Sequence, residues 1–373
     1  MKILAVAEHL DLAETHTLLG MHAAGVDLSV MLHPAVPHFS TLHDQLPDVT
    51  PLEMRRDIDP EAIRSIRRKL RSRPYDVLYM IPTKRPVIQG LRASRGMSIK
   101  RVAYRGVVGS ISQLNVLSHL SYLSPNLDRI FCACDAVRDG LHGVGIARRK
   151  LVRIYKGHDL DWYHPAPRST LAPLGMKRDD FVVACATHIQ PRKGVPILLK
   201  ALDRLVQNSE LPIHVLLLGE VADRAVRRLG RDPRISHRVH FAGNHPDTTA
   251  LVAACDAFVM PSLRREGMAR SVMEAMAQGL PTVVSDVGGL PELVRHGESG
   301  LVARAGDPIA LAAAIEQLAR DPELCRLLGA GARARIRADF TIQDTVRETI
   351  AAFGALAPSG EALPGLTPRP VHV

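Results

Sequence analysis

Two glutamates, Glu266 and Glu274, stand eight residues apart in the second half of the chain. They follow a short apolar run, 257–260, that is typical of a buried strand, and Glu274 lies in an amphipathic segment, 268–278, that predicts a helix. Open α/β sheets bind ligands beyond the carboxyl ends of their strands, and the free N–H groups at a helix start attract anions. A phosphate would fit at this helix start, and the two glutamates are near enough to hold two parts of one extended ligand, so that one carboxylate can reach a sugar and the other a ribose.

The same two glutamates also permit a purely structural interpretation. Acidic residues near a helix start are favoured by capping and by the helix dipole, with no ligand needed. Only the surrounding sequence can distinguish between the two interpretations. It contains a dense block of motifs: Glu266-Gly267, Glu274-Ala-Met-Ala277, Gly279-Leu-Pro281-Thr-Val-Val284, Gly288-Gly-Leu-Pro-Glu292 and Gly297-Glu-Ser-Gly-Leu-Val302.

This block resembles that of the family-4 glycosyltransferases, among the glycosyl transferases group 1, which carry two glutamates at this spacing. Further motifs match outward and in order: the segment 152–165, in which Lys156 and His158 depart from the family pattern, Lys193-Gly194, Leu217-Leu-Gly219 and Phe241-Ala-Gly243. The resemblance covers roughly residues 100–350. It implies a GT-B fold and a reaction that retains the configuration of the transferred sugar.

Apolar runs alternate with amphipathic segments along both halves of the chain, which by itself predicts two doubly wound α/β domains. We predict strands near 2–7, 27–32, 75–81, 100–105, 129–133, 151–155, 181–186, 213–218, 238–241, 256–260, 281–284 and 300–303. We predict helices near 194–207, 268–278, 307–319 and 341–356. A stretch rich in proline, glycine and aspartate, 157–167, is the predicted linker.

The resemblance adds a role to each domain of this α/β, GT-B architecture, in which two Rossmann-like parallel-sheet domains face a central cleft. Residues 1–160 would bind the acceptor, with the C-terminal helix 341–356 packing back on them, and residues 161–340 would bind the nucleotide-sugar donor. Residues 357–373 are expected to be a loose tail.

The resemblance also assigns roles to single residues of the second domain. Glu266 would contact donor-sugar hydroxyls, Glu274 the ribose, and Lys193 the diphosphate. A fixed cation and a helix dipole would stabilise the charge that develops on the leaving diphosphate, so that neither a metal nor a cofactor is implied. The remaining donor-binding candidates are His188, Arg192, Gly219 and the backbone of Gly267, Met268 and Ala269.

His188 is a departure, because the family usually has an arginine five positions before the lysine that corresponds to Lys193. Arg192 can replace that arginine. A protonated His188 could also do so, and activity would then fall as the pH rises and the ring loses its proton. Alternatively, His188 is a satisfied polar side chain at a strand end.

The first domain departs further from the family pattern. Its first loop, 8–16, lacks the usual glycine pair, and Arg105 stands where a histidine that approaches the donor sugar is expected. Arg105 and His119 are both candidates for that catalytic role. The alternatives are a buried salt bridge for Arg105 and a core position for His119.

The net charge of +10 predicts an anionic partner, but aromatic residues make up only 4% of the chain, which argues against nucleic acid. The segment 61–73 predicts a basic helix with an apolar stripe of Ile63, Ile66 and Leu70. This helix could lie against acidic lipid as a peripheral membrane contact. Alternatively, it packs on the sheet and exposes a solvated charged face.

The start of the chain reads as a strand rather than a signal peptide, and no apolar run approaches the roughly 20 residues that span a bilayer. We therefore expect a cytoplasmic protein with reduced cysteines. The expected activity is hexosyl transfer from a nucleotide-sugar to a saccharide or lipid-linked cell-envelope acceptor of lipopolysaccharide or exopolysaccharide type. The alternatives are a nucleotide-sugar epimerase or hydrolase of the same architecture, and a catalytically silent polyanion-binding protein.

Overall fold

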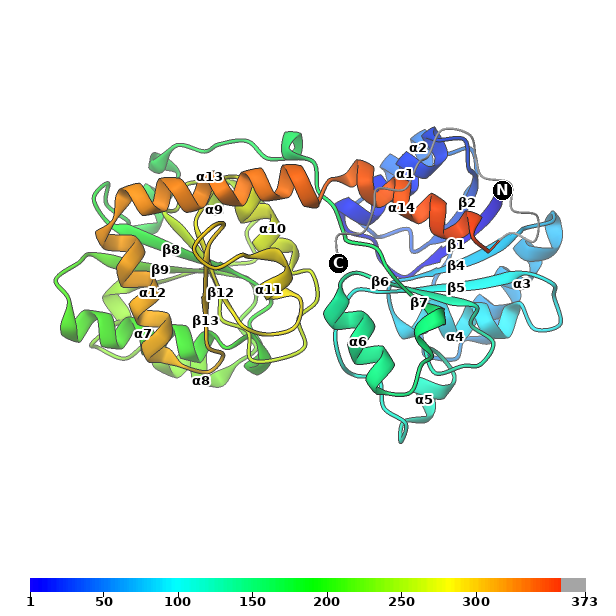
Figure 1. Ribbon diagram of the computed structural model, residues 1–373, viewed down its shortest axis with the longest axis horizontal. Helices are drawn as coiled ribbons and strands as arrows, with labels where there is room; N and C mark the ends of the chain where they lie inside the picture. Colours follow the sequence, from blue (N-terminus) through cyan, green and yellow to red (C-terminus); the bar gives the residue numbers. More distant parts are fainter. Residues whose placement is uncertain (357–373) are drawn as a thin grey trace. The chain divides into compact units, whose positions relative to one another are not determined.

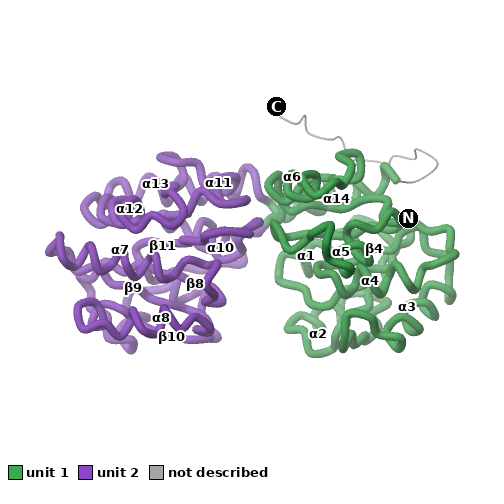
Figure 2. Tube along the Cα trace, turned by 90° about the horizontal axis from the view of Figure 1, so that it is seen from below, with its two compact units in different colours: residues 1–157, 341–373 green, residues 158–340 purple. Residues whose placement is uncertain are grey.

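The computed structural model describes residues 1–356, and the predicted loose tail, 357–373, lies outside the described residues. The chain divides into two compact units (Figure 2). Unit 1 comprises Met1–Gly157 and the chain from Thr341 onward, and unit 2 comprises His158–Phe340. The C-terminal helix α14 (Ile342–Gly354) thus belongs to unit 1.

Unit 1 is built on a parallel sheet with the strand order β3-β2-β1-β4-β5-β6-β7. Its strands are nearly continuous buried apolar runs, because helices cover both faces of the sheet (Figure 1). The strands are β1 (Lys2–Ala7), β2 (Asp27–Leu32), β3 (Val49–Pro51), β4 (Val77–Ile81), β5 (Lys100–Arg105), β6 (Arg129–Cys132) and β7 (Leu151–Arg153). The short edge strand β3 was not predicted, since it has only three partly exposed residues.

Two pairs of helices cover the sheet of unit 1. Helices α1 (Leu12–Ala23) and α14 pack against each other on one face, and α3 (Pro60–Ser72) and α4 (Lys84–Ala93) do so on the other. The ring of Phe353 on α14 lies 4.9 Å from that of Phe131 on β6, so that the C-terminal helix completes the core. The remaining helices are α2 (Phe39–Gln45), α5 (Val116–His119) and α6 (Asp135–Gly143).

Unit 2 repeats this architecture with the strand order β10-β9-β8-β11-β12-β13. Its strands are β8 (Phe181–Ala186), β9 (Ile213–Leu218), β10 (Val239–Gly243), β11 (Ala257–Met260), β12 (Thr282–Ser285) and β13 (Leu301–Ala303). Its helices are α7 (Val195–Asn208), α8 (Arg224–Leu229), α9 (Thr248–Ala253), α10 (Arg270–Ala277), α11 (Leu290–Leu293), α12 (Pro308–Arg320) and α13 (Pro322–Asp339). The prediction of two doubly wound α/β domains is confirmed.

The main core cluster of unit 2 lies between the sheet and the paired helices α7 and α12, while α10 packs with α9 and α13 on the opposite face. Among residues 1–356, the structure contains no helix that is long and apolar enough to cross a membrane.

Candidate active site

The strand order of unit 2 reverses between β8 and β11, the point at which open α/β sheets bind ligands. The loop after β8 carries His188, Arg192 and Lys193, and the loop after β11 carries Glu266. The sheet therefore brings together side chains that lie more than 70 residues apart in the sequence.

Glu266 is almost completely buried, with 5% of its side chain exposed. Its Oε1 atom lies 2.6 Å from Lys193 Nζ and 3.5 Å from Arg192 Nη1, and it accepts a hydrogen bond of 2.8 Å from the Ser262 hydroxyl. Within residues 1–356, the other oxygen, Oε2, has no hydrogen-bond partner. One carboxylate oxygen thus fixes the side chain, whereas the other makes no such bond.

Two close backbone approaches hold these loops in place, and both require glycine. Gly194 has φ 67°, and a Cβ atom there would lie 1.9 Å from the carbonyl oxygen of Pro261. Gly288 has φ 58°, and a Cβ atom there would lie 2.1 Å from the carbonyl oxygen of Glu266. Two of the glycines in the sequence motifs therefore let the Lys193 and Glu266 loops reach their positions.

A cavity of about 340 Å³ opens at this edge of the sheet. It is lined by predicted site residues from several loops: His188, Lys193, Gly219, Ala269 and Glu274. The cavity is large enough for part of a drug-sized ligand. Lys193 and Glu274 both line it.

Glu274 lies on α10, and its Oε1 atom is 3.2 Å from Arg270 Nε one helical turn earlier. Helix α10 begins at Arg270, two residues later than the predicted start at 268, because Ala269 has an extended backbone conformation and acts as the N-cap. No side chain caps this helix, so its first amides are free of an internal side-chain partner. Of the three predicted backbone donors, Ala269 lines the cavity, whereas Gly267 and Met268 lie beside it in the loop.

His188 lines the cavity with half of its side chain exposed, and its Nδ1 atom is 3.9 Å from Glu220 Oε2. The ring thus lies where an anion could reach it. Arg192 is one third exposed and contacts Glu266 rather than the cavity wall.

Among the cavity residues that the sequence did not predict, Asn244, His245 and Thr248 come from one segment. They follow β10, whose end was recognised only as the Phe241-Ala-Gly243 motif. The available signal was their position after a predicted parallel strand, since the carboxyl ends of all such strands meet at one edge of the sheet.

Arg105 is buried in unit 1, but the alternative that it forms a salt bridge was wrong. Its Nε donates to the carbonyl oxygen of Val107 at 3.0 Å, and its Nη2 donates to that of Gly109 at 2.6 Å and to the hydroxyl of Ser110 at 2.7 Å. The guanidinium also lies 5.0 Å from the ring centroid of Tyr122. Its donors therefore hold the loop that follows β5.

His119 is exposed, so the alternative of a core histidine was also wrong. Its Nε2 atom lies 2.7 Å from the carbonyl oxygen of Gln113 in the preceding loop. Arg105 and His119 thus both form hydrogen bonds with the segment between β5 and α5. The sequence did not predict these bonds, because most of the partners are backbone groups.

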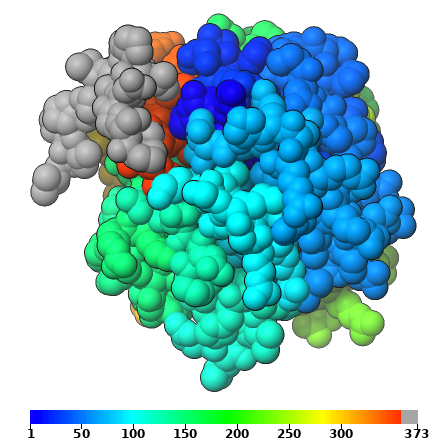
Figure 3. All heavy atoms as spheres, turned by 90° about the vertical axis from the view of Figure 1, so that its right-hand side faces the viewer, coloured from blue at the N-terminus to red at the C-terminus, as the bar shows by residue number. Residues whose placement is uncertain are grey.

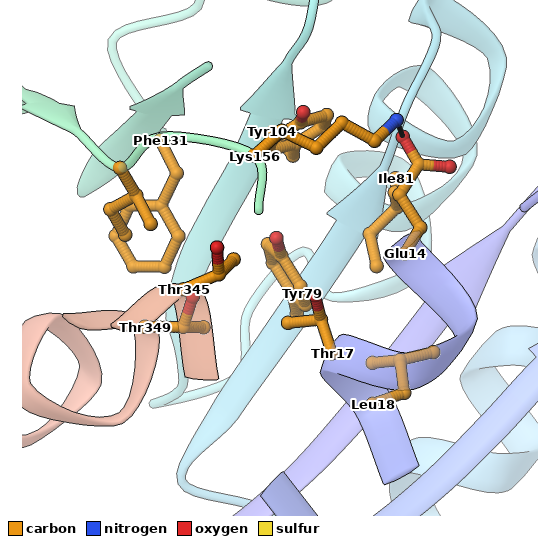
Figure 4. A pocket seen from close by; sticks show the side chains of 11 residues that line it. Glu14, Thr17, Leu18, Tyr79, Ile81, Tyr104, Phe131, Lys156, Thr345 and Thr349 are labelled. Atoms are coloured by element: carbon orange, nitrogen blue, oxygen red, sulfur yellow. Dashed lines mark hydrogen bonds and ion pairs between the residues drawn. The ribbon is translucent and has the colours of Figure 1, made fainter. Parts of the chain in front are cut away.

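Lys156, a departure from the family pattern, lies in a buried charged cluster at the end of the sheet of unit 1 (Figure 4). Its Nζ pairs with Asp11 and lies 3.1 Å from Glu14 Oε1. Burial alone would lower the pKa of Lys156, but these carboxylates outweigh it and hold the pKa above its usual value. The cluster adjoins a cavity of about 30 Å³, which has room for about one water molecule.

Over the described range, 1–356, no group of three or more histidine, cysteine, aspartate and glutamate side chains is arranged to hold a metal ion. The buried thiols are poor nucleophiles, since burial raises the pKa of Cys132, Cys185 and Cys255 to about 12. The charged and titratable side chains that line the unit 2 cavity are those of Lys193, Arg270, Glu274, His188 and His245.

Residues 180–321, which contain all the residues that line the unit 2 cavity, match the family model described as glycosyl transferases group 1. This part of the chain is therefore similar to the glycosyl transferases group 1. The chain is 32% identical over 255 residues to the D-inositol 3-phosphate glycosyltransferase of Geodermatophilus obscurus, a match that covers 63% of this chain and 55% of that relative. It is 36% identical over 154 residues to the lipopolysaccharide core biosynthesis glycosyltransferase LpsE of Rhizobium meliloti, covering 41% and 44% of the two chains.

The chain spans about half the length of these curated relatives. The similarity of the fold covers more of the chain than the similarity of the sequence. The crystal structure of HepE from Anabaena in complex with UDP is similar over 95% of this chain and 100% of HepE, with a TM-score of 0.78 and 23% identity. The predicted GT-B fold is therefore confirmed.

Proposed function

We propose that this chain transfers a sugar, with retained configuration, from a nucleotide-sugar donor to a saccharide or lipid-linked cell-envelope acceptor. The observation that carries the proposal is the contact between Lys193 and Glu266 beside the cavity that Glu274 also lines. A nucleotide-sugar has three parts that need recognition, and this arrangement supplies one charged side chain for each.

Lys193 would bind the diphosphate. When the bond between the anomeric carbon and the diphosphate oxygen breaks, negative charge builds up on that oxygen, and a fixed cation nearby stabilises the transition state. Lys193 is only 12% exposed, so its charge acts with little screening by solvent. The free amides at the start of α10 would add their partial positive charge, and His188, which lines the same cavity, would contribute as well. Arg192 would act through its contact with Glu266.

Glu266 and Glu274 would hold the two ends of the donor. Glu266 Oε2 would accept from hydroxyls of the sugar, and Glu274, on α10, would accept from the ribose hydroxyls. Burial of Glu266 strengthens such a bond, because carboxylate acceptors bond more strongly than neutral ones and water does not compete.

Unit 1 would bind the acceptor. There, we propose that Arg105 and His119 act by holding the segment between β5 and α5 rather than by direct contact with the donor, since their polar atoms already bond to its backbone. LpsE is named for lipopolysaccharide core biosynthesis, which supports a cell-envelope acceptor for this chain.

Donor binding can be tested by a thermal-shift screen of UDP-, GDP- and ADP-sugars with the full chain. HepE was crystallised with UDP, so UDP-sugars are the first candidates. A specific ligand at 100 times its Kd stabilises the folded state by about 2.7 kcal/mol. We expect one nucleotide class to raise the melting temperature of the wild type and to have a much smaller effect on Glu274→Gln, while Glu316→Gln, on α12 and outside the cavity lining, responds like the wild type.

The outcome also separates the alternatives. Donor consumption without any acceptor would indicate an epimerase or hydrolase, and donor binding without turnover under any condition would indicate a silent binding protein. A chain that responds to none of the nucleotide-sugars would contradict the proposal.

We propose further that α3 makes a peripheral contact with an anionic membrane. Ile66 and Leu70 face the core, whereas Arg64, Arg68 and Arg71 are exposed. Each such arginine near an anionic surface adds about 1 kcal/mol. Binding to vesicles that contain phosphatidylglycerol should weaken as salt is added, and absence of binding at low ionic strength would contradict this contact.

A further inference from the structure

The segment Val107–Val116, which we call the apolar loop, connects β5 to α5 in unit 1. It exposes 96% of Leu114, 72% of Val116 and 46% of Val107. The loop and α5 extend beyond the sheet of unit 1 (Figure 1), and turquoise atoms of this part of the chain form the lowest protrusion in Figure 3. Single exposed apolar residues are common, but a group of them on one projecting loop indicates contact with another apolar phase.

The apolar loop also lacks charge. From Gly106 to Leu127 the sequence contains no aspartate, glutamate, lysine or arginine, although such residues make up 23% of the whole chain. Moving a charged side chain out of water is costly unless it is paired. This segment can therefore leave water without that cost.

Three carbonyl groups in the first half of the apolar loop have side-chain partners within the protein. Val107 and Gly109 accept from the Arg105 guanidinium, and Ser110 accepts from Lys84 Nζ at 2.8 Å. Carbonyl groups of a surface loop in water need no such partners, because water supplies them. Each of these three bonds lowers the cost of moving its carbonyl group out of water.

The tip of the apolar loop is bonded in the same way. The amide of Ser112 donates to the Ser118 hydroxyl at 3.2 Å, and the amide of Leu114 donates to the Ser112 hydroxyl at 3.2 Å. The carbonyl of Gln113 is bonded to His119 Nε2. The amides of Ser112 and Leu114 and the carbonyl of Gln113 therefore have partners within the protein, which leaves fewer polar groups at the tip for water to solvate.

We propose that the apolar loop inserts Leu114 and Val116 into the interfacial region of a lipid bilayer. The net charge of +10 favours an anionic bilayer over a second copy of this chain, which would bring an equal positive charge to the contact. The inference rests on the proposed function only in that a lipid-linked acceptor gives the contact its purpose. It is independent of α3, because it predicts an apolar component of binding that salt does not remove.

The first test is flotation of the full chain with vesicles of phosphatidylcholine, with and without phosphatidylglycerol, at low and high salt. Burying one leucine contributes enough to change affinity about tenfold or more. We expect Leu114→Asp/Val116→Asp to lower vesicle affinity at least about tenfold at both salt concentrations. Leu327→Asp is the matched control, because Leu327 is 53% exposed on α13 of unit 2, and it should float like the wild type.

A second test measures the insertion of position 114 directly and does not depend on a variant that loses vesicle binding. An environment-sensitive fluorophore on Leu114→Cys should shift to shorter wavelength when vesicles are added and should be quenched by brominated lipid, whereas the same fluorophore on Leu327→Cys should show neither effect. Equal flotation of the wild type and the double variant, or an unchanged fluorophore at position 114, would overturn the proposal. So would concentration-dependent self-association that the double variant abolishes in the absence of vesicle binding.

These outcomes remain separate from those of the donor screen. The double variant should keep the thermal-shift response of the wild type to the nucleotide-sugar, because residues 114 and 116 lie in unit 1 and outside the unit 2 cavity. Vesicle binding without any nucleotide-sugar response would support the bilayer contact and contradict the proposed transfer. A nucleotide-sugar response without vesicle binding would support the proposed transfer and contradict the bilayer contact.

Discussion

Lys193 Nζ lies 2.6 Å from Glu266 Oε1, across 73 residues of sequence, with 12% and 5% of the two side chains exposed. Because both side chains are largely buried, their mutual attraction is the main interaction that offsets the cost of removing each charge from water. The contact also sets the two candidate donor-binding groups at a fixed separation before any ligand arrives. Preorganisation of this kind reduces the cost of reorganisation during a reaction.

Replacing Lys193 by methionine should leave Glu266 buried without its nearest cation. We expect Lys193→Met to lower sugar transfer about 10²- to 10³-fold and to destabilise the fold by about 3 kcal/mol. Adding Glu266→Gln should restore much of the stability but not the activity, and urea denaturation together with transfer rates measures both. Additive losses of stability in the double variant would show that the two residues do not act as a pair.

Gly288→Ala should disturb the site through the backbone. A Cβ atom there would lie 2.1 Å from the carbonyl oxygen of Glu266, in addition to the strain at φ 58°. Gly297→Ala is a matched control, because φ is 79° there and no atom lies within 4 Å of the added carbon. We expect about 1 kcal/mol of destabilisation for Gly297→Ala and about 3 kcal/mol for Gly288→Ala, with a loss of donor binding only in the latter. Equal effects of the two substitutions would contradict this account.

The pH dependence of transfer should reveal the role of His188. If the protonated ring stabilises the diphosphate, wild-type activity falls on the alkaline side as the imidazole loses its proton. His188→Arg keeps a positive charge at the cavity and should retain activity over that range. Rate profiles of the two proteins that coincide across the pH range would show that His188 carries no catalytic charge.

The paired rings of His214 and His240 should make the stability of unit 2 depend on pH. His214 Nδ1 lies 2.9 Å from His240 Nε2, and burial, only partly offset by Asp180, lowers the pKa of His214 to about 4. Since the folded state favours the neutral ring, the stabilisation is present above about pH 6.5 and is lost as the pH falls toward 4. Partial exposure to solvent reduces the effect to about 1–2 kcal/mol.

Urea denaturation at pH 7 and pH 4.5 measures this effect. His214→Gln should flatten the pH dependence of the unfolding free energy relative to the wild type. His237→Gln, at an exposed position nearby, should not. Parallel slopes for the wild type and His214→Gln would assign the acid sensitivity to other groups.

Lys156→Met should be strongly destabilising, by about 3–5 kcal/mol, since it leaves the carboxylates of Asp11 and Glu14 in the core of unit 1 without a cation. Burial already raises the pKa of Glu14. The stability of the variant should therefore recover as the pH is lowered and Glu14 takes up a proton. Combining Lys156→Met with Asp11→Asn and Glu14→Gln should recover stability at neutral pH, and a triple variant as unstable as Lys156→Met would argue against uncompensated charge as the cause.

The amino-acid sequence by itself determined the two parallel sheets, most strand positions and the motif block around Glu266 and Glu274. These features are local. A buried parallel strand is a short apolar run, and a glycine that tolerates positive φ or a close backbone approach must stand at one position, so each leaves its mark within a few residues.

Only the tertiary structure decided which groups meet. It joined Lys193, Ser262 and Glu266, directed Arg105 to backbone carbonyls rather than to a carboxylate, and left His119 and Leu114 exposed. Burial and hydrogen-bond partners depend on residues that are remote in the chain and adjacent in space, and a local pattern contains no record of them.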